Sequence, residues 1–482
     1  MIEKRHEKYN DLSFRCGFLF QRYVTKFGHS EIREVMIQKA LLETYRNDFL
    51  PLERRRNEKP PIYMDNACTT LVPRQVVSAI HEYYSSYPSC GGRRSHHWFA
   101  EEVTQQIEGN PDKGIQGARP LIALFINASS EKEIIFTLNT THAINMVALG
   151  IKFRPGDVVL LTDREHNSNL LPWLRLQKLG VIKVEYIDAM QGDEFDLEAF
   201  EKQFEGKQVR LVSMAWTSNV TGATIPAREV IMITHRYGAR VLLDGAQTVP
   251  HQAVDVRALD VDFLTFSLHK MCGPKGVGIL YGKSELLGRG SEEWEAGDEV
   301  IEPTILGGGT VENSTYSSYH LLETPERFEA GIPNYPGQIA SGVAVEYLRE
   351  IGLDRIKAHE EHLNEYLTEA LQNRYGDLEW FHILGPQSAS RRGGIMSFEV
   401  QRPNAVGIAD ELNTKNNIMI RDGVFCVHSF FNKQYGLNWL HPKSHREHRM
   451  IYRISLYLYN TLEECDVFLE TLDLIFKERS YL

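Results

Sequence analysis

The sequence predicts an α/β fold with a large, mainly parallel sheet and a smaller C-terminal α+β domain. From residue 61 to about residue 334, short apolar runs alternate with helical stretches, which is typical of a parallel sheet built from βαβ units. From about residue 337, two long amphipathic segments, 339–351 and 353–373, precede two further apolar runs. The 482 residues, 42% of them hydrophobic, are enough to bury a large core.

These patterns divide the chain into three parts, residues 1–60, 61–336 and 337–482. We predict that the first part is a helical extension and linker, because 31–45 has apolar residues at helical spacing and 52–61 is charged and ends in two prolines. It carries 13 Lys and Arg against 9 Asp and Glu, although the whole chain has a net charge of −11. A basic docking surface is an alternative, but a linker needs only solubility.

Composition also excludes several classes of protein. A net charge of −11 argues against a protein that coats nucleic acid, which would carry a basic excess. No apolar run approaches the roughly 18 residues of a membrane span, and the N-terminus opens with charged residues, so we expect a cytoplasmic protein. The six cysteines are scattered without a CxxC pair, which favours neither a disulfide framework nor a structural zinc site, and we expect no metal.

The alternating region contains five expected strands, and the C-terminal part contains two. They are Glu133 to Thr137, Asp157 to Leu161, Val209 to Ala215, Arg240 to Leu243 and Asp262 to Phe266, then Gly394 to Glu399 and Ile451 to Leu456. In open parallel sheets, ligands gather beyond the carboxyl ends of the strands. The polar residues that follow each strand are therefore the candidates for a site.

Polar residues follow each of the first three strands. Thr140 and Thr141 can open a helix whose free N–H groups and hydroxyls would hold a phosphate. His166 follows the second strand and Asn219 the third. Taken singly, these residues are weak evidence for a site, because a helix cap, a structural histidine and ordinary turn chemistry explain them more simply.

The last two strands of this region make the set specific. Asp244 follows one of them and Lys270 the next. A pyridoxal phosphate enzyme needs this pair, because a Lys amine forms the Schiff base and an Asp keeps the pyridine nitrogen protonated, so that the ring acts as an electron sink. His166 could lie over the ring face. The donors for the phosphate would be Thr140, Thr141, Ser267 and His269. A surface lysine is the alternative for Lys270, and the other strand ends disfavour it.

One cysteine near the C-terminus stands apart from the others. Cys426 lies in an expected loop after an apolar stretch, with Arg421 five residues before it. A Cys becomes a nucleophile when nearby cations favour its thiolate and when substrate can reach it. An isolated Cys is otherwise a buried, inert residue. The residues themselves leave both possibilities open.

Several segments, taken in order, match one family. They are Ile62-Tyr-Met-Asp-Asn-Ala-Cys-Thr-Thr, Asn139-Thr-Thr-His-Ala-Ile-Asn, Glu165-His, Pro172-Trp, Thr217-Ser-Asn-Val-Thr-Gly, Asp244-Gly-Ala-Gln, Ser267-Leu-His-Lys, Gly273-Pro-Lys-Gly-Val-Gly-Ile-Leu-Tyr, Arg327-Phe-Glu-Ala-Gly, Arg421-x-Gly-x-x-Cys and Arg453-Ile-Ser-Leu-Tyr-Leu-Tyr-Asn-Thr. Over about residues 61 to 478, the chain resembles class V aminotransferase-fold pyridoxal phosphate enzymes. The closest subgroup is the Suf-type cysteine desulfurases and selenocysteine lyases.

The resemblance implies a fold-type I transferase that forms a homodimer, with active sites at the dimer interface, and removes sulfur from L-cysteine. For the cofactor, it implies Lys270 as the Schiff-base lysine, Asp244 on the pyridinium nitrogen, Gln247 on the ring hydroxyl oxygen, His166 on the ring face, and Thr141, Ser267 and His269 on the phosphate. For the substrate, it implies Asn219 and Arg453 on the carboxylate, Arg421 and His97 in the pocket, and Cys426 as the sulfur acceptor.

The resemblance also implies an order of events. Lys270, freed by the substrate amine, would remove the α-proton, and the Cys426 thiolate would attack the substrate sulfur. The products would be alanine and a persulfide on Cys426, which normally passes to an acceptor protein.

The chain departs from the family pattern at several places. Ile332 stands where the family has a Thr that reaches the partner subunit's phosphate, and Val424 and Phe425 stand where the Suf-type group commonly has two His. Two apparent insertions, 109–119 and 435–448, could alter substrate scope or bind a partner. Three histidines of the second, His441, His445 and His448, could ligate a metal, although an exposed polar loop is the simpler interpretation.

Two other functions compete with the desulfurase interpretation. The same fold hosts C–S lyases, epimerases and kynureninase-like enzymes, which need no nucleophilic Cys426. A non-catalytic scaffold that has kept the fold is the second alternative, and the intact set of Lys270, Asp244, His166 and Arg453 argues against it.

Overall fold

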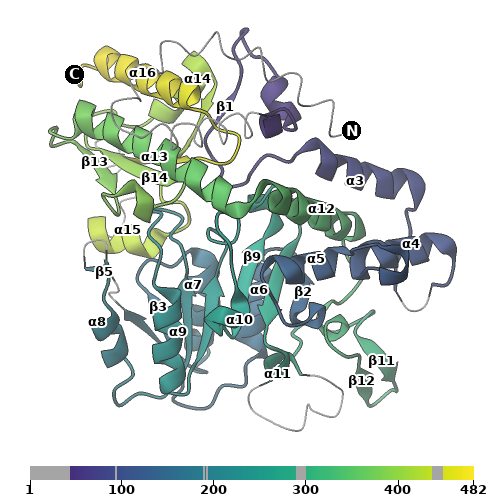
Figure 1. Cartoon of the computed structure of the whole chain (residues 1–482). Coiled ribbons are helices and arrows are strands. Elements are labelled where there is room, and N and C mark those ends of the chain that lie inside the picture. Colours follow the sequence, from purple (N-terminus) through teal and green to yellow (C-terminus); the bar gives the residue numbers. More distant parts are fainter. Residues whose placement is uncertain (1–43, 93–94, 188–189, 192–193, 289–299, 437–448) are drawn as a thin grey trace. The chain divides into compact units, whose positions relative to one another are not determined.

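The computed structural model describes residues 44–482 except 93–94, 188–189, 192–193, 289–299 and 437–448 (Figure 1). Contacts divide the chain into residues 1–47 and a compact unit of residues 48–482, and the fold below is that of the second unit. Most of the helix predicted at 31–45 lies outside the described residues. In the described part of the chain, no helix is long and apolar enough to cross a membrane.

A seven-stranded sheet forms the centre of this unit. Its order is β2 (Ile134–Thr137), β10 (Gly278–Gly282), β9 (Phe263–Ser267), β8 (Arg240–Asp244), β7 (Val209–Ala215), β3 (Val158–Thr162) and β4 (Lys183–Ile187). Neighbouring strands from β9 to β4 are parallel, whereas β10 is antiparallel to both of its neighbours. The predicted α/β class and all five predicted strands of this region are confirmed, with ends within one residue.

Two strands of this sheet were not predicted. The apolar part of β10 is only three residues long and is bounded by Gly278 and Gly282, so it resembles a glycine-rich loop. Strand β4 is an edge strand of alternating, partly exposed residues, which gives a weak apolar signal.

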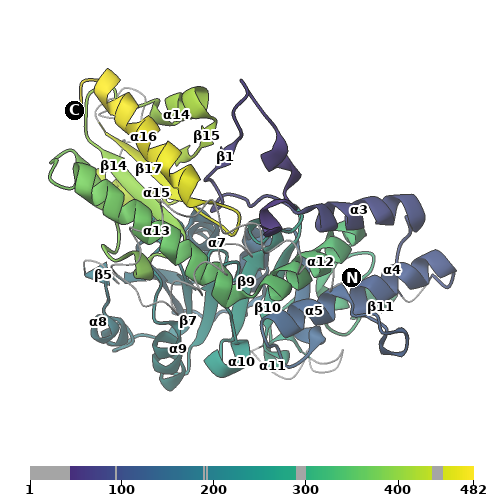
Figure 2. The same ribbon diagram turned by 45° about the horizontal axis from the view of Figure 1, so that its top comes forward.

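Helices cover the sheet and bury its apolar side chains. They are α6 (Thr140–Gly150), α7 (Asn167–Lys178), α8 (Leu197–Lys202), α9 (Ala227–Arg236), α10 (Val256–Leu259) and α11 (Ser284–Leu287). Helices α6 and α7 pack on each other and on strands of the sheet, around the buried Trp173. A second group consists of α3 (Arg74–Ser86), α4 (Trp98–Glu108), α5 (Ala118–Phe125) and α12 (Tyr335–Ile351), in which α12 packs against the other three (Figure 2).

The C-terminal part folds around an antiparallel sheet of β13 (Phe381–Leu384), β14 (Ile395–Val400), β17 (Met450–Ser455) and β16 (Arg421–Asp422). Helices α13 (Leu353–Tyr375), α14 (Ile408–Asn416) and α16 (Leu462–Glu478) pack on this sheet through an aromatic core (Figure 1). Helix α16 begins with a capping box in which Thr461 and Glu464 satisfy each other's backbone N–H groups. The predicted smaller α+β domain is confirmed as a fold class, whereas the predicted domain boundaries stay a prediction.

The chain that precedes the large sheet is attached to the small one. Strand β1 (Ile62–Tyr63) pairs in parallel with β15 (Ile418–Met419), and Asp65 forms a bridge with Ser455 at the end of β17. The family motif that begins at Ile62 is thereby brought to the C-terminal half of the chain.

The parallel strands bring their carboxyl ends to one edge of the large sheet, and antiparallel β10 begins at that edge. A Cβ atom on Gly278, the first residue of β10, would lie 2.5 Å from the Asn139 Cα atom. Glycine is therefore required for β10 to pass close to Asn139, which caps α6. This close approach places the start of α6 beside the end of β9.

A loop of the large sheet, 217–224, packs tightly against the small one. Gly222 lies there at φ +71°, and a Cβ atom on it would meet the Arg392 carbonyl oxygen at 2.3 Å. In the same loop, the Val220 carbonyl accepts a hydrogen bond from the Ser397 hydroxyl of β14 at 2.5 Å. The backbone itself thus forms the junction between the two sheets at this point.

We expect Gly222→Ala to destabilise the protein more than Gly238→Ala does. Gly238 has nearly the same φ, +72°, but a Cβ atom on it meets nothing within 4 Å. Gly238→Ala should cost only the left-handed backbone penalty of about 1 kcal/mol, whereas Gly222→Ala adds a clash with backbone, for a total loss of about 3 kcal/mol. Urea unfolding followed by circular dichroism measures both losses, and equal losses would show that the junction is not tightly packed.

Candidate active site

Asp244 and Lys270 lie at adjacent strand ends of the large sheet. Asp244 is the last residue of β8, and Lys270 ends the 3-10 turn η5 (Leu268–Lys270) directly after β9. The two strands are parallel neighbours, with Asp244 opposite Thr265. Within the described part of the chain, the side chain of Lys270 has no hydrogen bond or ion pair, so its amine is available for a ligand.

Burial shifts both groups toward their neutral forms. It lowers the pKa of Lys270, and the nearby Asp244 carboxylate opposes this shift. It raises the pKa of Asp244, opposed by the Ala246 N–H, which donates to Oδ1 at 3.0 Å, and by Lys270. A neutral amine is the nucleophilic and basic form of lysine, and a cation beside Asp244 would stabilise its carboxylate.

Hydroxyl groups gather where α6 begins. Thr140 N donates to Ser267 Oγ at 2.8 Å, and the two hydroxyl oxygens lie 2.7 Å apart. Next to them, the hydroxyls of Thr141 and Ser168 lie 2.6 Å apart. Hydroxyl donors at the positive end of an 11-residue helix suit a phosphate group.

His166 lies beside these hydroxyls and is neutral at pH 7. Its Nδ1 accepts from Ser168 N at 3.1 Å and lies 3.0 Å from Ser168 Oγ. Burial, together with the positive charges of Lys270 and Arg453, lowers the pKa of His166 to about 4. Ser168, which connects His166 to Thr141, was not among the predicted site residues, although it lies two residues after His166 at a strand end.

Glu165, which belongs to the family motif Glu165-His but had no predicted role, is a buried acid at this edge. Glu165 accepts hydrogen bonds from Asn169 Nδ2 at 2.6 Å and from Ala215 N, at the end of β7, at 2.8 Å. The pKa of Glu165 is raised to about 7, mainly because the carboxyl group is buried. Asn169 in turn accepts from the indole of Trp173 at 3.2 Å. This network holds the start of α7, and hence His166, against β7.

Cys426 belongs to a loop that is anchored on the same edge. Its carbonyl accepts from Asn167 N at 2.8 Å, next to His166, and both Phe425 and Cys426 have positive φ values, +48° and +60°. The thiol residue is exposed, whereas its apolar neighbours Val424 and Phe425 are buried in a cluster with Val220. The loop is therefore held by its backbone and its apolar flanks, and its thiol stays accessible.

The predicted carboxylate-binding residues lie next to this loop. Arg453 is buried in β17, and its Nη1 donates to the Asn219 carbonyl at 3.1 Å. Asn219 Nδ2 donates to the Phe425 carbonyl at 2.8 Å, and the Phe425 ring lies 4.8 Å from the Arg453 guanidinium carbon. Arg421 of β16 is directly opposite Arg453. The structure thus brings Asn219, Arg421 and Arg453 together with the Cys426 loop.

His97 was also predicted to line the substrate pocket, but none of its described contacts reaches Asn219, Arg421, Arg453 or the Cys426 loop. It caps α4, where its Nδ1 accepts from Ala100 N at 3.3 Å and its Nε2 lies 3.5 Å from Ser89 Oγ. Both views place α4 to the side of the large sheet (Figures 1 and 2). Its role in a substrate pocket stays a prediction.

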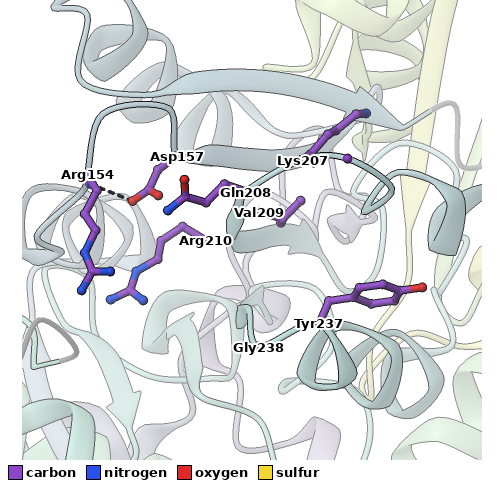
Figure 3. Close-up of a pocket in the computed structure, with 9 residues that line it drawn as sticks. Arg154, Asp157, Lys207, Gln208, Val209, Arg210, Tyr237 and Gly238 are labelled. Atoms are coloured by element: carbon purple, nitrogen blue, oxygen red, sulfur yellow. Dashed lines mark hydrogen bonds between the residues drawn. The ribbon is translucent and has the colours of Figure 1, made fainter.

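One cavity lies near the carboxyl ends of the strands of the large sheet, and another lies near their amino ends. One, of about 280 Å³, adjoins the strand-end residues through Gln247 and extends past His251 to Glu360 of α13. Another, of about 550 Å³, lies between Arg154, Lys207 and Gly238 (Figure 3). These residues precede β3, β7 and β8 or begin them, so the larger cavity is at the opposite edge and does not belong to the site.

Comparison with known proteins agrees with this geometry. Residues 62–468 match the family model of the class-V aminotransferases. This chain belongs to that family. Its relatives include a probable cysteine desulfurase of Pyrococcus abyssi, 35% identical over 86% of this chain and 94% of the relative, and a cysteine desulfurase of Haloferax volcanii, 34% identical over 88% and 91%. The apo structure of a cysteine desulfurase from Thermococcus onnurineus superposes with a TM-score of 0.77 at 33% identity, covering 90% of this chain and 98% of that one.

A class-V aminotransferase uses pyridoxal 5′-phosphate as its cofactor, and the residues present fit this group. Gln247 donates through Nε2 to the Ala67 carbonyl at 2.7 Å, which leaves its buried Oε1 without a partner among the described residues and able to accept from a ring hydroxyl. The buried Asp244 carboxylate suits a protonated ring nitrogen, and the hydroxyls at α6 suit a phosphate. The site therefore matches the ring hydroxyl, the ring nitrogen and the phosphate of pyridoxal phosphate with three different kinds of group.

The structure bears on the departures from the family pattern. Ile332 is 80% exposed, so it makes little contact within this chain. Most of the 435–448 insertion, including His441, His445 and His448, lies outside the described residues. The insertion at 109–119 is described, and there the Asn110 and Ile115 backbones pair before α5 begins.

We expect Glu165→Gln to change the pH dependence of stability. Folding raises the Glu165 pKa from 4.5 to about 7, so the folded state keeps a proton that the unfolded chain releases between these values. The contribution of Glu165 to stability is therefore complete below pH 4.5 and is lost as the pH rises to about 7, by about 3 kcal/mol in total.

Urea unfolding of both proteins at pH 5 and pH 8 tests this expectation. The wild type should lose more stability than Glu165→Gln between the two values, because all other titrating groups are common to both proteins and cancel in the comparison. Equal pH dependence would show that Glu165 is already ionised at pH 5.

Proposed function

We propose that this protein is a pyridoxal phosphate-dependent cysteine desulfurase. It would convert L-cysteine to L-alanine and transfer the sulfur to Cys426 as a persulfide, for delivery to an acceptor. The observation that carries the proposal is the anchoring of the Cys426 loop: its backbone bonds to the start of α7 beside His166, and its neighbour Phe425 lies against Arg453. This arrangement supports a thiol that works with the cofactor residues, and the relatives named as cysteine desulfurases support it as well.

The proposed cofactor contacts follow from the fit described above. Lys270 would bind the cofactor covalently, Asp244 would hold its ring nitrogen, and Gln247 its hydroxyl. The neutral ring of His166 would cover the ring face. The proposed phosphate ligands are Thr140, Thr141, Ser267 and His269. When bound, pyridoxal phosphate supplies an electron sink for the charge that develops at the substrate α-carbon.

Lys270 is the proposed acid and base. Burial lowers the pKa of its Nζ, so a larger fraction is neutral and able to accept the α-proton of the substrate. Asp244 opposes this shift, which keeps the protonated amine accessible for returning the proton.

Arg453 and Asn219 are the proposed carboxylate ligands, with Arg421 beside them. A guanidinium group can give a carboxylate two parallel charged hydrogen bonds, which fixes both its position and its orientation. The 3.1 Å contact between Arg453 Nη1 and the Asn219 carbonyl supports one shared subsite for the two residues.

Cys426 is the proposed sulfur acceptor. Its Sγ would form a bond to the substrate sulfur as the substrate Cβ–S bond breaks, and a proton on the carbon would complete alanine. The resulting persulfide would remain on an exposed residue, where an acceptor protein could reach it. We also propose a homodimer, for which the exposed Trp98 and Ile332 provide apolar surface, and sedimentation velocity of the purified protein tests it.

We expect Cys426→Ala to lower alanine formation from L-cysteine at least about 100-fold, because the attacking thiol is lost. Cys90→Ala, which removes another exposed thiol, is the matched control and should keep full activity. Amino acid analysis measures alanine, and mass spectrometry of the alkylated protein measures the persulfide on Cys426. Borohydride reduction followed by mass spectrometry shows whether the cofactor is bound to Lys270 in each variant.

Two outcomes would contradict the proposal. Continued turnover by Cys426→Ala would favour a C–S lyase, an epimerase or a kynureninase-like enzyme. A wild-type protein without cofactor on Lys270 would favour a non-catalytic scaffold.

A further inference from the structure

Two arginines face each other on adjacent strands of the small sheet. Arg421 of β16 and Arg453 of β17 are direct partners in this antiparallel pair. Like charges at directly opposite positions destabilise a sheet. Burial makes this pair more costly, because only 3% of the Arg453 side chain is exposed, against 45% for Arg421.

A single carboxylate pairs with both guanidinium groups. Asp65 Oδ1 lies 3.0 Å from Arg453 Nη2, and its Oδ2 lies 3.1 Å from Arg421 Nε. The backbone holds Asp65 in place, since it bridges to Ser455 and its carbonyl accepts from Cys68 N at 3.1 Å. Asp65 follows β1, so a residue from the start of the compact unit bridges two strands near its end.

The ion pairs of Asp65 with Arg421 and Arg453 leave one positive charge uncompensated and one buried N–H donor without a partner in the part of the chain that the structure describes. Asp65 compensates one of the two guanidinium groups, and no other acid pairs with either of them among the described residues. Arg453 directs Nη2 at Asp65 and Nη1 at the Asn219 carbonyl, whereas its buried Nε has no hydrogen-bond partner in the described part of the chain. The remaining charge and the Nε donor match one further carboxylate.

We propose that Asp65 is a positioning residue for the substrate carboxylate, which holds Arg453 and Arg421 so that one uncompensated positive charge and the Arg453 Nε donor face the bound amino acid. This inference rests on the proposed function, because it assigns the substrate's α-carboxylate to Arg453. Asp65 itself would not touch the substrate.

Removing the Asp65 charge has two opposing effects. The local positive charge rises by one, which attracts a carboxylate. The two opposed guanidinium groups, however, then repel each other, Arg421 can turn into solvent, and Arg453 keeps only the Asn219 carbonyl as a hydrogen-bonding anchor. Screening by solvent weakens the first effect, whereas the second removes the fixed geometry that the hydrogen bond from Arg453 Nε requires. We therefore expect weaker carboxylate binding.

Binding of L-alanine and L-alaninamide to the cofactor-loaded protein tests the inference, with the cofactor absorbance as the readout. The two ligands share the amine and the methyl group, and only alanine has a carboxylate. Asp65→Asn should raise the dissociation constant of L-alanine at least tenfold and leave that of L-alaninamide within twofold. In steady-state assays with L-cysteine, KM should rise more than kcat falls.

Asp473→Asn is the matched control. Asp473 pairs with Arg374 and accepts from Tyr375, so this variant removes an ion pair of the same domain away from the site. Both dissociation constants should stay at their wild-type values. If Asp65→Asn does not fold, the double variant Asp65→Asn/Arg421→Gln removes the opposed charges as well and should restore thermal stability without restoring the affinity for L-alanine.

Three results would overturn the inference. They are unchanged or tighter L-alanine binding by Asp65→Asn, an equal loss of affinity for both ligands, and a wild-type protein that does not prefer alanine to alaninamide. Failure of the proposed function is distinguishable, because a wild-type protein that binds L-alanine through its carboxylate but forms no alanine from L-cysteine would contradict the desulfurase and leave the role of Asp65 intact.

Discussion

The burial of two opposite charges, Lys270 and Asp244, at adjacent strand ends is the constraint on which the rest of the structure depends. Buried charges are costly unless they are paired or their pKa values shift toward the neutral form. Both shifts are present here, since burial lowers the pKa of Lys270 and raises that of Asp244. A parallel sheet provides this arrangement directly, because β8 and β9 run side by side and end at the same edge.

The remaining site residues are brought to that edge by backbone contacts more than by side chains. Gly278 lets β10 pass close to the start of α6, and Gly222 lets the loop at 217–224 pack against the Arg392 carbonyl. The Cys426 loop is held in the same way, through its carbonyl on Asn167 and its buried flanks. The apolar Val424 and Phe425, which depart from the pattern that the family resemblance implies, form part of this anchor.

The sequence predicted which residues lie together wherever the end of a strand was enough to place them. Asp244 and Ser267 end buried strands and Lys270 lies in the turn after one, so topology alone places them at one edge. Ser168 was not predicted, and Glu165 was named only in a family motif without a role, because their contacts depend on partners, Thr141 for the first and Ala215 for the second, that are distant in sequence. His97 was predicted only from the family resemblance, and its described contacts are local to α4.

The sequence by itself determined the alternation of strands and helices and the residues at the strand ends, because side-chain periodicity and chain direction follow from local order. Only the tertiary structure decided that Asp65 would lie between Arg421 and Arg453, 356 and 388 residues away along the chain. The physical reason is that pairing of β1 with β15 and of β16 with β17 sets which charges meet, and these pairings join segments whose separation in sequence carries no information about their distance in space.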